Sequence, residues 1–443
     1  APLVCLVVAI VLGFVRKLNT GLVAIGLALV VGRAGGLSDA EIIKGFNSSL
    51  FVMLLGVTYL FSIAQVNGTL ELFARKAVGL TGRRLYLVPI VVFLLSSFLS
   101  AIGPGSIPVM ALMMPFSMAL ATEMKVSPLL LAPMGVLGAC GAGISPLAPT
   151  GIIGLTLSAQ IGYTGIELPY FLNSYIVLTT WATVLYFALG GHRLKSGDGI
   201  ANDRTLEEPA SPDAPTAVRS GSGKSPGHIA SSEYDPAQRK TLAGIACMVL
   251  GVLIFKVNVG LAAFLVSFML TLMGVADENK AIAGVPWGTL LLVTGVGVLM
   301  EVGIKLGSIK LLGSFLARFM NSSTATLMAG LTGGVMSWFS STSGVVLPTL
   351  IPTVPELISS VGGGVEPLTL ISAITNSSHA AASSPLSTGG ALALAAYVGQ
   401  AQASAGDGQK LFVRMFLVSA VGVAFVSILG GLGLYDVIAG LVR

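Results

Sequence analysis

Long apolar runs, separated by short polar stretches, fill most of the chain. In the first half they lie near residues 2–15, 20–34, 47–66, 86–120, 128–160 and 170–190. In the second half they recur near residues 242–257, 261–276, 286–305, 324–357, 367–398 and 411–434. A helix that crosses the hydrocarbon core of a bilayer needs about 20 such residues. The pattern therefore predicts an all-α polytopic membrane protein that is embedded in a lipid bilayer.

The stretch from 193 to 240 breaks this pattern. It is rich in Ser, Pro, Gly and Asp and contains almost no apolar run. Such a composition cannot bury enough surface to fold. We therefore predict a disordered linker here, between a first repeat at 1–192 and a second repeat at 241–443.

The two apolar halves share one spacing, which is why we call them repeats. A shift of 239 residues places Asn19-Thr20-Gly21-Leu22 on Asn258-Val259-Gly260-Leu261. The same shift places Ser145-Pro146-Leu147 on Ser384-Pro385-Leu386. The matched residues are mostly Gly, Pro and Ser, which set the shape of the backbone. One register that holds over such a distance indicates an internal duplication.

The composition excludes several classes of protein. Of the 443 residues, 54% are hydrophobic and 10% are charged, whereas about 25% of a soluble domain is charged. This argues against a cytosolic enzyme. The three cysteines are far apart, and neither a metal-binding spacing nor a phosphate-binding loop is present. The net charge of +5 is ordinary for a membrane protein, so we expect no nucleic-acid partner. Because the motifs are missing, we also expect no enzyme activity and no resident cofactor.

The distribution of basic residues suggests a topology. If the segment at 86–120 and its copy are re-entrant hairpins, each repeat crosses the membrane five times, and this odd number makes the repeats inverted. With a periplasmic N-terminus, the linker is cytoplasmic and the first repeat obeys the positive-inside rule. The inner side then holds Arg16, Lys17, Arg75, Lys76, Arg83, Arg84 and Lys125, and the outer side Arg33 and Lys44. The second repeat shows no such bias, so its orientation rests on the duplication. We predict ten crossings and two hairpins in the bacterial inner (plasma) membrane.

Four polar, Gly/Pro-rich breaks interrupt the long apolar segments. They form two pairs under the shift: 100–108 with 339–347, and 143–151 with 382–390. Irregular backbone at membrane depth is tolerated only where it is buried in protein or lines a cavity. The N-terminus of a broken helix attracts anions, and its freed carbonyl groups hold cations such as Na⁺. The breaks therefore predict one site, built from both repeats near the middle of the membrane.

The side chains at the breaks indicate the charge of the substrate. No Lys, Arg or Asp lies in the middle of a predicted span, whereas hydroxyl and amide groups cluster at the breaks. Neutral donors and helix N-termini together favour a small anionic substrate. The candidate substrate-binding residues are Gly103, Pro104, Gly105, Ser106, Ser145, Pro146, Thr150, Ser341, Thr342, Ser343, Asn376, Ser377, His379, Ser384, Pro385, Ser387 and Thr388. The candidate Na⁺ positions are Gly103, Gly105, Gly151, Ser341, Gly344 and Gly390.

Two titratable residues in apolar segments leave alternatives open. His379 lies beside the second broken helix and could contact a carboxylate, carry a coupling proton, or be a structural histidine. The position equivalent to His379 in the first repeat holds Cys140, so the duplication supports none of these roles. We expect Glu301 to reach the membrane surface or to pair with Lys305, one turn further along its helix.

The sequence also resembles a known family. The run KGFNSSLFVMLLGVTYLFSIAQVNGTLELFARKAV, at 44–78, is similar to the N-terminal signature region of MatC-type dicarboxylate (malonate) carriers. The stretches SAIGPGSIPVMALMMP, GISPLAPTG and SSPLSTGGALALA are similar to later parts of that family. They are shared more loosely across the ion transporter superfamily, which includes divalent anion/sodium symporters. The resemblance implies a homodimer in which a mobile transport domain moves against a static scaffold, as in an elevator.

The resemblance places the functional breaks by position. The hairpin tips would be Gly103–Ser106 and Ser341–Gly344, and the broken-helix loops Ser145–Gly151 and Ser384–Gly390. The Ser-Asn-Thr tips of the sodium symporters are absent, and GPGS and SSTS stand in their place. Coupling to Na⁺ and coupling to H⁺ through His379 therefore both stay open.

Our principal hypothesis is a secondary active transporter, a symporter that imports a small dicarboxylate such as malonate or a C4-dicarboxylate. A passive anion channel is the alternative from another class, since no sequence pattern separates gating from alternating access. Another small anion, such as a sulfonate or an oxyanion, is an alternative substrate. An intramembrane enzyme would require a buried Asp pair, a reactive serine motif or a metal cluster, none of which the sequence contains.

Overall fold

The computed structural model describes residues 2–16, 18–79, 84–194, 233–255, 257–398 and 405–441. These residues form helices and connecting turns, with no strand among them. Most of the predicted linker, Lys17 and Arg83 lie outside the described residues. The end of the predicted linker is helical, because α11 begins at Pro236.

The helices of the first half follow the apolar runs. They are α1 (Pro2–Arg16), α2 (Thr20–Ala34), α3 (Asp39–Ile43), α4 (Ser48–Val66), α5 (Thr69–Gly79), α6 (Val88–Ala101), α7 (Ser106–Glu123), α8 (Pro128–Ala142), α9 (Pro149–Gln160) and α10 (Glu167–Ala188). A short 3₁₀ turn, η1 (Leu85–Leu87), precedes α6, and another, η2 (Gly191–Arg193), follows α10. The segments predicted at 86–120 and 128–160 are each broken into two helices, as the Gly and Pro residues within them indicate.

The second half repeats the first almost helix by helix. Its elements are α11 (Pro236–Phe255), α12 (Val259–Leu272), α13 (Glu278–Gly284), α14 (Trp287–Lys305), α15 (Ser308–Ala317), α16 (Ala325–Phe339), η3 (Thr342–Val346), α17 (Leu347–Leu350), η4 (Ile351–Thr353), α18 (Val354–Ser360), α19 (Pro367–Ala381), α20 (Thr388–Val398), α21 (Ala405–Gly431) and α22 (Leu434–Gly440). Under the shift of 239 residues, α4 coincides with α14 and α8 with α19 at both ends. The counterpart of α7 is interrupted by a π turn and Pro residues, and it forms η3 to α18.

Local interactions start equivalent helices in the same way. The side chain of Asn19 caps α2 and accepts from the N–H of Gly21 at 2.9 Å. The side chain of Asn258 caps α12 and accepts from the N–H of Gly260 at 3.0 Å. An Asn side chain in this position satisfies N–H groups that have no partner within the helix.

The two repeats are interlocked. A Cβ on Gly295 of α14 would overlap the backbone of Gly21 on α2, and a Cβ on Gly21 would overlap the backbone of α14 at Leu291. Gly260 of α12 is packed in the same way against Gly56 of α4. The shift exchanges these two contacts, as a two-fold relation between the repeats requires. Each repeat therefore contributes a helix pair that packs on the long helix of the other repeat.

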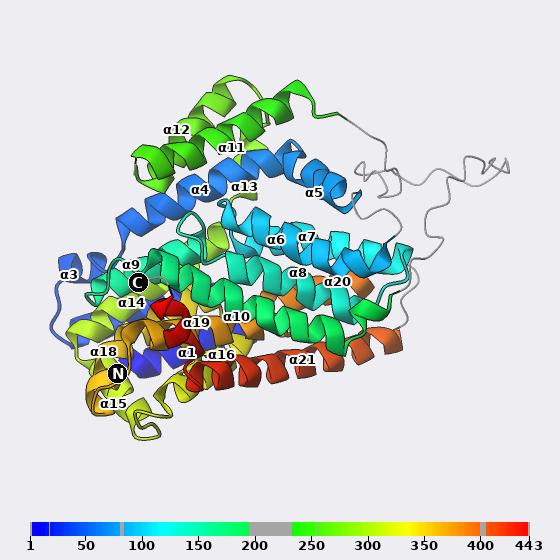
Figure 1. Ribbon diagram of the computed structural model, residues 1–443. Coiled ribbons are helices and arrows are strands. Elements are labelled where there is room, and N and C mark those ends of the chain that lie inside the picture. Colours follow the sequence, from blue (N-terminus) through cyan, green and yellow to red (C-terminus); the bar gives the residue numbers. More distant parts are fainter. Residues whose placement is uncertain are drawn as a thin grey trace, which may run out of the picture.

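The helices divide into two outer groups and a central body. In Figure 1, α11 and α12 lie above α4 at the top of the molecule. Elsewhere in the molecule, α1, α2 and α14 share a small apolar core of their own. The helices α6 to α10 and α16 to α22 share the large core, to which α4, α5 and α11 to α13 also contribute. Both α4 and α14 therefore lie between an outer helix pair and the central body.

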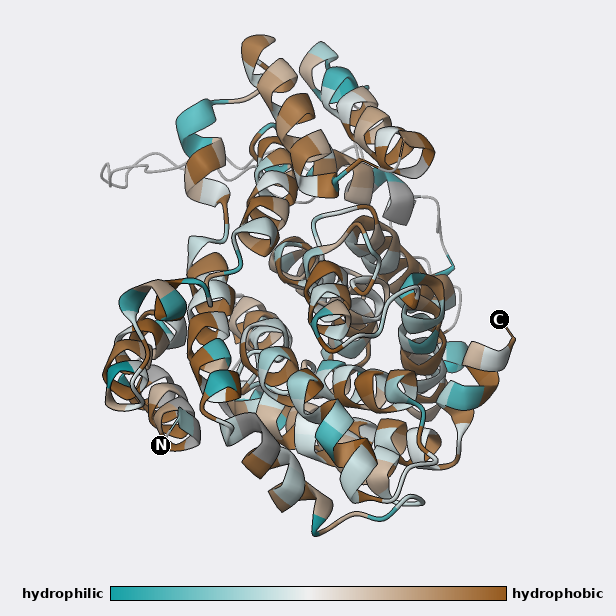
Figure 2. Ribbon diagram, turned by 90° about the vertical axis from the view of Figure 1, so that its left-hand side faces the viewer, coloured by the Kyte–Doolittle hydropathy of each residue, from teal (hydrophilic) through white to brown (hydrophobic). Residues whose placement is uncertain are grey.

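The outward helix faces are apolar. On α12, the exposed side chains include Leu261, Leu265, Phe268 and Leu272, which are 57–69% exposed and follow one face of the helix. On the equivalent helix α2, Leu22 and Leu29 are at least 50% exposed. Figure 2 shows apolar residues over most of the helices. Continuous apolar faces of this kind suit contact with lipid.

Among the described residues, four helical segments have the length and apolar composition of membrane spans. They are Asp39–Val66, Glu167–Ala188, Trp287–Lys305 and Asp407–Gly431, which form two pairs under the shift. Shorter apolar helices include Pro128–Ala142 and Thr388–Val398, from the two broken segments. The all-helical polytopic class is thus supported, while ten crossings and inversion of the repeats stay predictions.

Candidate functional site

The first hairpin tip lies between α6 and α7. Its backbone turns through Gly103 and Gly105, whose φ values of 146° and 77° disfavour residues with a side chain. A Cβ on Gly103 would overlap the ring of Phe61 on α4, and one on Gly105 would lie 2.7 Å from Pro149 Cδ. The tip is therefore pressed between α4 and the start of α9.

The second hairpin tip lies between α16 and η3 and is held by hydroxyl groups. Ser341 Oγ accepts from the N–H of Gly344 at 3.1 Å. The hydroxyls of Ser337 and Thr342 lie 2.8 Å apart, and Ser337 donates to the carbonyl oxygen of Ser378 at 2.9 Å. These bonds fix the tip on the C-terminal end of α19.

The two broken-helix loops have the same hydrogen bonds. In the first loop, Ser145 Oγ accepts from the N–H of Leu147 at 3.3 Å, and in the second, Ser384 Oγ accepts from Leu386 at 3.1 Å. The N–H of Gly151 donates to Gly143 O at 3.2 Å. Its counterpart is the bond from Gly390 to Ala382 O at 3.0 Å. The Ser-Pro-Leu sequence and the later Gly thus specify one local shape twice.

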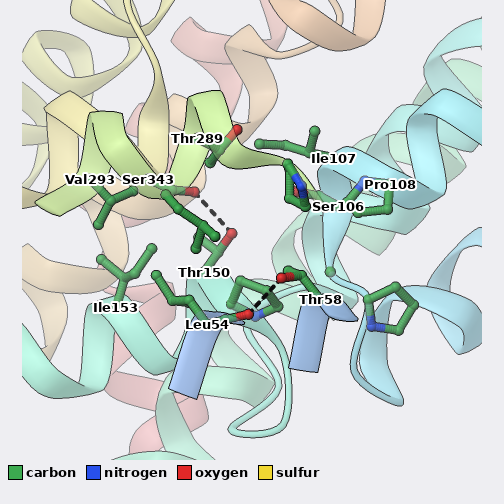
Figure 3. Close-up of a pocket in the computed structure, with 15 residues that line it drawn as sticks. Leu54, Thr58, Ser106, Ile107, Pro108, Thr150, Ile153, Thr289, Val293 and Ser343 are labelled. Carbon is green, nitrogen blue, oxygen red and sulfur yellow. Dashed lines mark hydrogen bonds between the residues drawn. The ribbon is translucent and has the colours of Figure 1, made fainter. Parts of the chain in front are cut away.

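A cavity of about 30 Å³ lies where the first tip, the first broken helix and the second hairpin meet. Figure 3 shows Ser106 from the first hairpin, Thr150 from α9 and Ser343 from the second hairpin around it. Its walls also include α4 and α14, which contribute residues that the sequence did not single out. These are Leu54, Thr58, Thr289, Leu290 and Val293.

A direct hydrogen bond closes this cavity. Thr150 Oγ1 and Ser343 Oγ lie 2.9 Å apart, and both residues are buried (Figure 3). Separation of Thr150 from Ser343 would widen this space toward the second hairpin.

The electrostatics of the cavity come from helix ends rather than from charged side chains. None of the residues that line it is charged. Ser106 begins α7, and Thr150 is the second residue of α9. Both helices therefore direct their N-terminal ends, which carry partial positive charge, to this place. The arrangement suits a small anion.

The structure brings three of the four breaks to this cavity. Of the candidate residues, Pro104, Gly105, Ser106, Thr150 and Ser343 line it. Gly103, Ser341, Thr342 and Gly344 belong to the two tips beside it, and Gly344 packs against Leu292 of α14. In the second broken-helix loop, Ser384, Pro385 and Gly390 are buried, Ser387 is half-buried and Thr388 is exposed, and none of them lines the cavity.

Other candidates lie away from the cavity. Asn376 is buried and donates to the carbonyl oxygen of Asn173 on α10 at 3.3 Å. Ser377 Oγ lies 2.8 Å from Ser427 Oγ on α21. His379 is 2% exposed, and its Nδ1 has no hydrogen-bond partner in the described structure. Within the first loop, Ser145 and Gly151 are buried and Pro146 is exposed.

The apolar helix faces and the broken helices define the class, a polytopic helical membrane protein. Residues 1–143 match the family model described as the N-terminus of the dicarboxylate carrier protein MatC. The resemblance predicted from the sequence is thereby confirmed for the first third of the chain. The comparison with curated proteins gave no match.

The fold is similar to that of a solved transporter, YdaH from Alcanivorax borkumensis, whose structure is described as having an unusual topology. The TM-score is 0.56, with 14% sequence identity, and the similarity covers 89% of this chain and 86% of that chain. At this identity the likeness concerns the fold alone. It extends over both repeats, beyond the part that the family model covers.

Proposed function

We propose that this protein is a secondary active transporter that moves a small dicarboxylate, such as malonate or a C4-dicarboxylate, across the inner membrane. The observation that carries the proposal is the buried cavity at which the N-terminal ends of α7 and α9 meet. Hydroxyls of Ser106, Thr150 and Ser343 surround it without a charged side chain. The family model that matches the first 143 residues, described as a dicarboxylate carrier, supports this choice of anion.

An elevator motion accounts for the two kinds of contact around the cavity. The tips of the hairpins touch α4 and α14 through Phe61 and Leu292, which are apolar contacts that allow sliding. The bond between Thr150 and Ser343 is a single neutral hydrogen bond, which is worth only about 1 kcal/mol net. In this proposal, α4, α14 and their outer helix pairs form the scaffold, and the central body carries the anion.

The orientation in the membrane completes the proposal. The exchanged glycine contacts of the repeats support a two-fold relation, and we propose that its axis lies in the membrane plane, so that the repeats are inverted. The N-terminus is then periplasmic and the linker cytoplasmic. A homodimer, and coupling to Na⁺ or H⁺, belong to the same proposal.

The test is transport by the purified full chain in liposomes. We expect labelled malonate or succinate to accumulate above its outside concentration when a Na⁺ or pH gradient is imposed, and ionophores should abolish this. Accumulation that ionophores do not affect would contradict an active transporter, and equilibration without accumulation would indicate a channel. Failure to take up any short dicarboxylate, with another anion accumulated instead, would reject the proposed substrate.

A further inference from the structure

A second cavity, of about 50 Å³, lies beside the first. It is bounded by α9, α14, the start of α4 and the Pro residues of α17 and η4. Ile153 and Val293 line both cavities, which therefore adjoin at these two side chains. The polar residues that line the second cavity are Asn47, Thr156, Gln160, Thr294 and Glu301.

Glu301 is the one charged residue among those that line this cavity. The basic residue nearest along its helix, Lys305, is paired with Glu41, with 4.0 Å between Lys305 Nζ and Glu41 Oε1. No hydrogen bond or ion pair engages the Glu301 carboxylate in the described part of the chain. A carboxylate in a membrane helix without a partner is costly and therefore points to a function.

Other charged groups lie near this end of α14. On the side of α3, Glu41 also accepts hydrogen bonds from Ser38, and Lys44 lies near Glu41. Asp39 is paired with Arg33 at 2.6 Å. The lining residues contributed by α9, α17 and η4 are uncharged. None of the residues that line the cavity therefore carries a positive charge opposite Glu301.

The equivalent position in the other repeat shows that this carboxylate is not required for packing. Under the shift, Glu301 corresponds to Ser62, whose hydroxyl donates to Ala281 O at 2.6 Å. Ser62 packs against Gly284, and Glu301 packs against the equivalent glycine, Gly45, in the same way. A neutral, fully bonded side chain thus fills this place in one repeat, and an unpaired carboxylate fills it in the other.

The available atoms suit a small, hard cation. Carboxylate, hydroxyl and amide oxygens surround the space, and no thiol or imidazole lines it. The hydroxyl proton of Thr294 is donated to Leu290 O at 2.8 Å, which leaves the oxygen lone pairs of Thr294 free. Gln160 ends α9, and carbonyl groups at a helix C-terminus favour positive charge.

We propose that Glu301 and this cavity bind the coupling cation, a single Na⁺ or H⁺. The proposal rests on the proposed function and names the site of its coupling. The helix α9 connects the two cavities, because Thr150 near its start faces the anion cavity and Thr156 and Gln160 face the cation cavity. A cation that neutralises Glu301 can then favour the position of α9 that admits the anion.

The first experiment measures cation binding without any substrate. The melting temperature of the detergent-solubilised full chain is compared in NaCl and in choline chloride, at pH 6 and pH 8. We expect Na⁺ or low pH to stabilise the wild type and the surface control Glu167→Gln, but not Glu301→Gln. Na⁺ dependence identifies sodium as the cation, and pH dependence alone identifies the proton. A response that is the same in Glu301→Gln, or no response in the wild type, overturns the proposal.

The second experiment measures coupling in liposomes. We expect Glu301→Gln to lose at least tenfold in dicarboxylate accumulation driven by the cation gradient, and the surface control Glu167→Gln to accumulate as the wild type does. Unchanged accumulation would overturn the proposal. If Glu301→Gln does not fold, Glu301→Asp decides, because it retains the charge and should shift the half-saturating Na⁺ concentration or the pH midpoint. An unchanged value in Glu301→Asp would overturn the cation site.

The two proposals fail differently. If no dicarboxylate is transported but the wild type still shows a cation response that Glu301→Gln lacks, the substrate assignment fails and the cation site stands. If dicarboxylate accumulates to the same extent in Glu301→Gln as in the wild type, the cation site fails and the transport function stands.

Discussion

The two repeats have nearly the same backbone and different chemistry. The loops around Ser145 and Ser384 share their hydrogen bonds, yet Thr150 in the first repeat corresponds to Gly389 in the second. A Cβ on Gly389 would lie 2.7 Å from Met110 Sδ and 2.9 Å from Ala382 O, so that position has no room for a hydroxyl-bearing side chain. Likewise, Ser62 corresponds to Glu301.

This difference shows which residues the duplication preserves. Gly, Pro and Ser residues that shape the hairpins and loops recur at equivalent positions, because both halves need the same breaks. Thr150, Ser343 and Glu301, which line the proposed anion and cation cavities, are replaced at the equivalent positions by Gly389, Pro104 and Ser62. Two halves with similar helices therefore carry different side chains at equivalent positions.

The largest loss of stability is expected for substitutions in the two broken-helix loops, where the two halves are most alike. Gly151→Ala and Gly390→Ala each place a Cβ into the carbonyl oxygen of the preceding loop, Ser145 O or Ser384 O. Overpacking of this kind costs about 1–3 kcal/mol, and we expect both variants to melt at clearly lower temperatures. Gly26→Ala on α2 is the control, because its Cβ would meet nothing within 4 Å. Equal melting of Gly151→Ala and wild type would show that the loop tolerates a side chain.

The second prediction tests the hydroxyl groups that line the anion cavity. Thr150→Val and Ser343→Ala each remove a hydroxyl from the cavity, and we expect the affinity for the dicarboxylate to fall about tenfold, as loss of about 1–1.5 kcal/mol of hydrogen bonding gives. The measurement is half-saturation of uptake or of thermal stabilisation.

Matched controls for this prediction lie on exposed helix faces. Thr183→Val removes an exposed hydroxyl that donates to Thr179 O, and Ser359→Ala removes one that donates to Glu356 O. Both should leave the affinity unchanged. If the controls and the cavity variants lose affinity equally, the cavity is not the binding site.

The third prediction compares Ser62 with Glu301. Ser62→Ala removes a buried hydrogen bond to Ala281 O, and we expect it to lower the free energy of unfolding by about 1 kcal/mol. It should leave the Na⁺ and pH dependence of uptake as in the wild type. A change in the cation dependence of Ser62→Ala would mean that the two equivalent positions share one function.

The smallest effects are expected at the helix caps. Asn258→Ala should cost about 1 kcal/mol of stability through loss of the α12 cap. Asn19→Ala should cost somewhat more, because Asn19 Nδ2 also donates to Gly288 O at 2.7 Å. The melting temperatures of the two variants, measured under one condition, show which of them loses more stability. The reverse order would show that the bond between the repeats contributes nothing measurable.

Much of the fold could be predicted from the sequence. The apolar runs at 47–66 and 286–305 correspond to α4 and α14 within one residue at each end. The breaks at 100–108 and 143–151 also lie where Gly and Pro interrupt the runs. These features depend on local backbone preferences and on hydrophobicity, which each stretch carries without help from the rest of the chain.

The candidate site was less predictable. Asn376 and Ser377 lie three and two residues before His379, yet their side chains bond to α10 and α21, away from the anion cavity. The rotation of α19 that decides this comes from its packing against several helices at once. The expected pairing of Glu301 with Lys305 likewise did not account for Glu41, which is distant in sequence.

The sequence by itself determined the helical membrane class, the duplication and the position of the breaks, because hydrophobicity, Gly and Pro act locally. Only the tertiary structure decided that three breaks meet at one cavity, that Thr150 and Ser343 close it, and that Glu301 lies unpaired in the cavity beside it. The physical reason is that these contacts join side chains far apart in the chain. Their meeting depends on how helices of both repeats rotate and pack against each other.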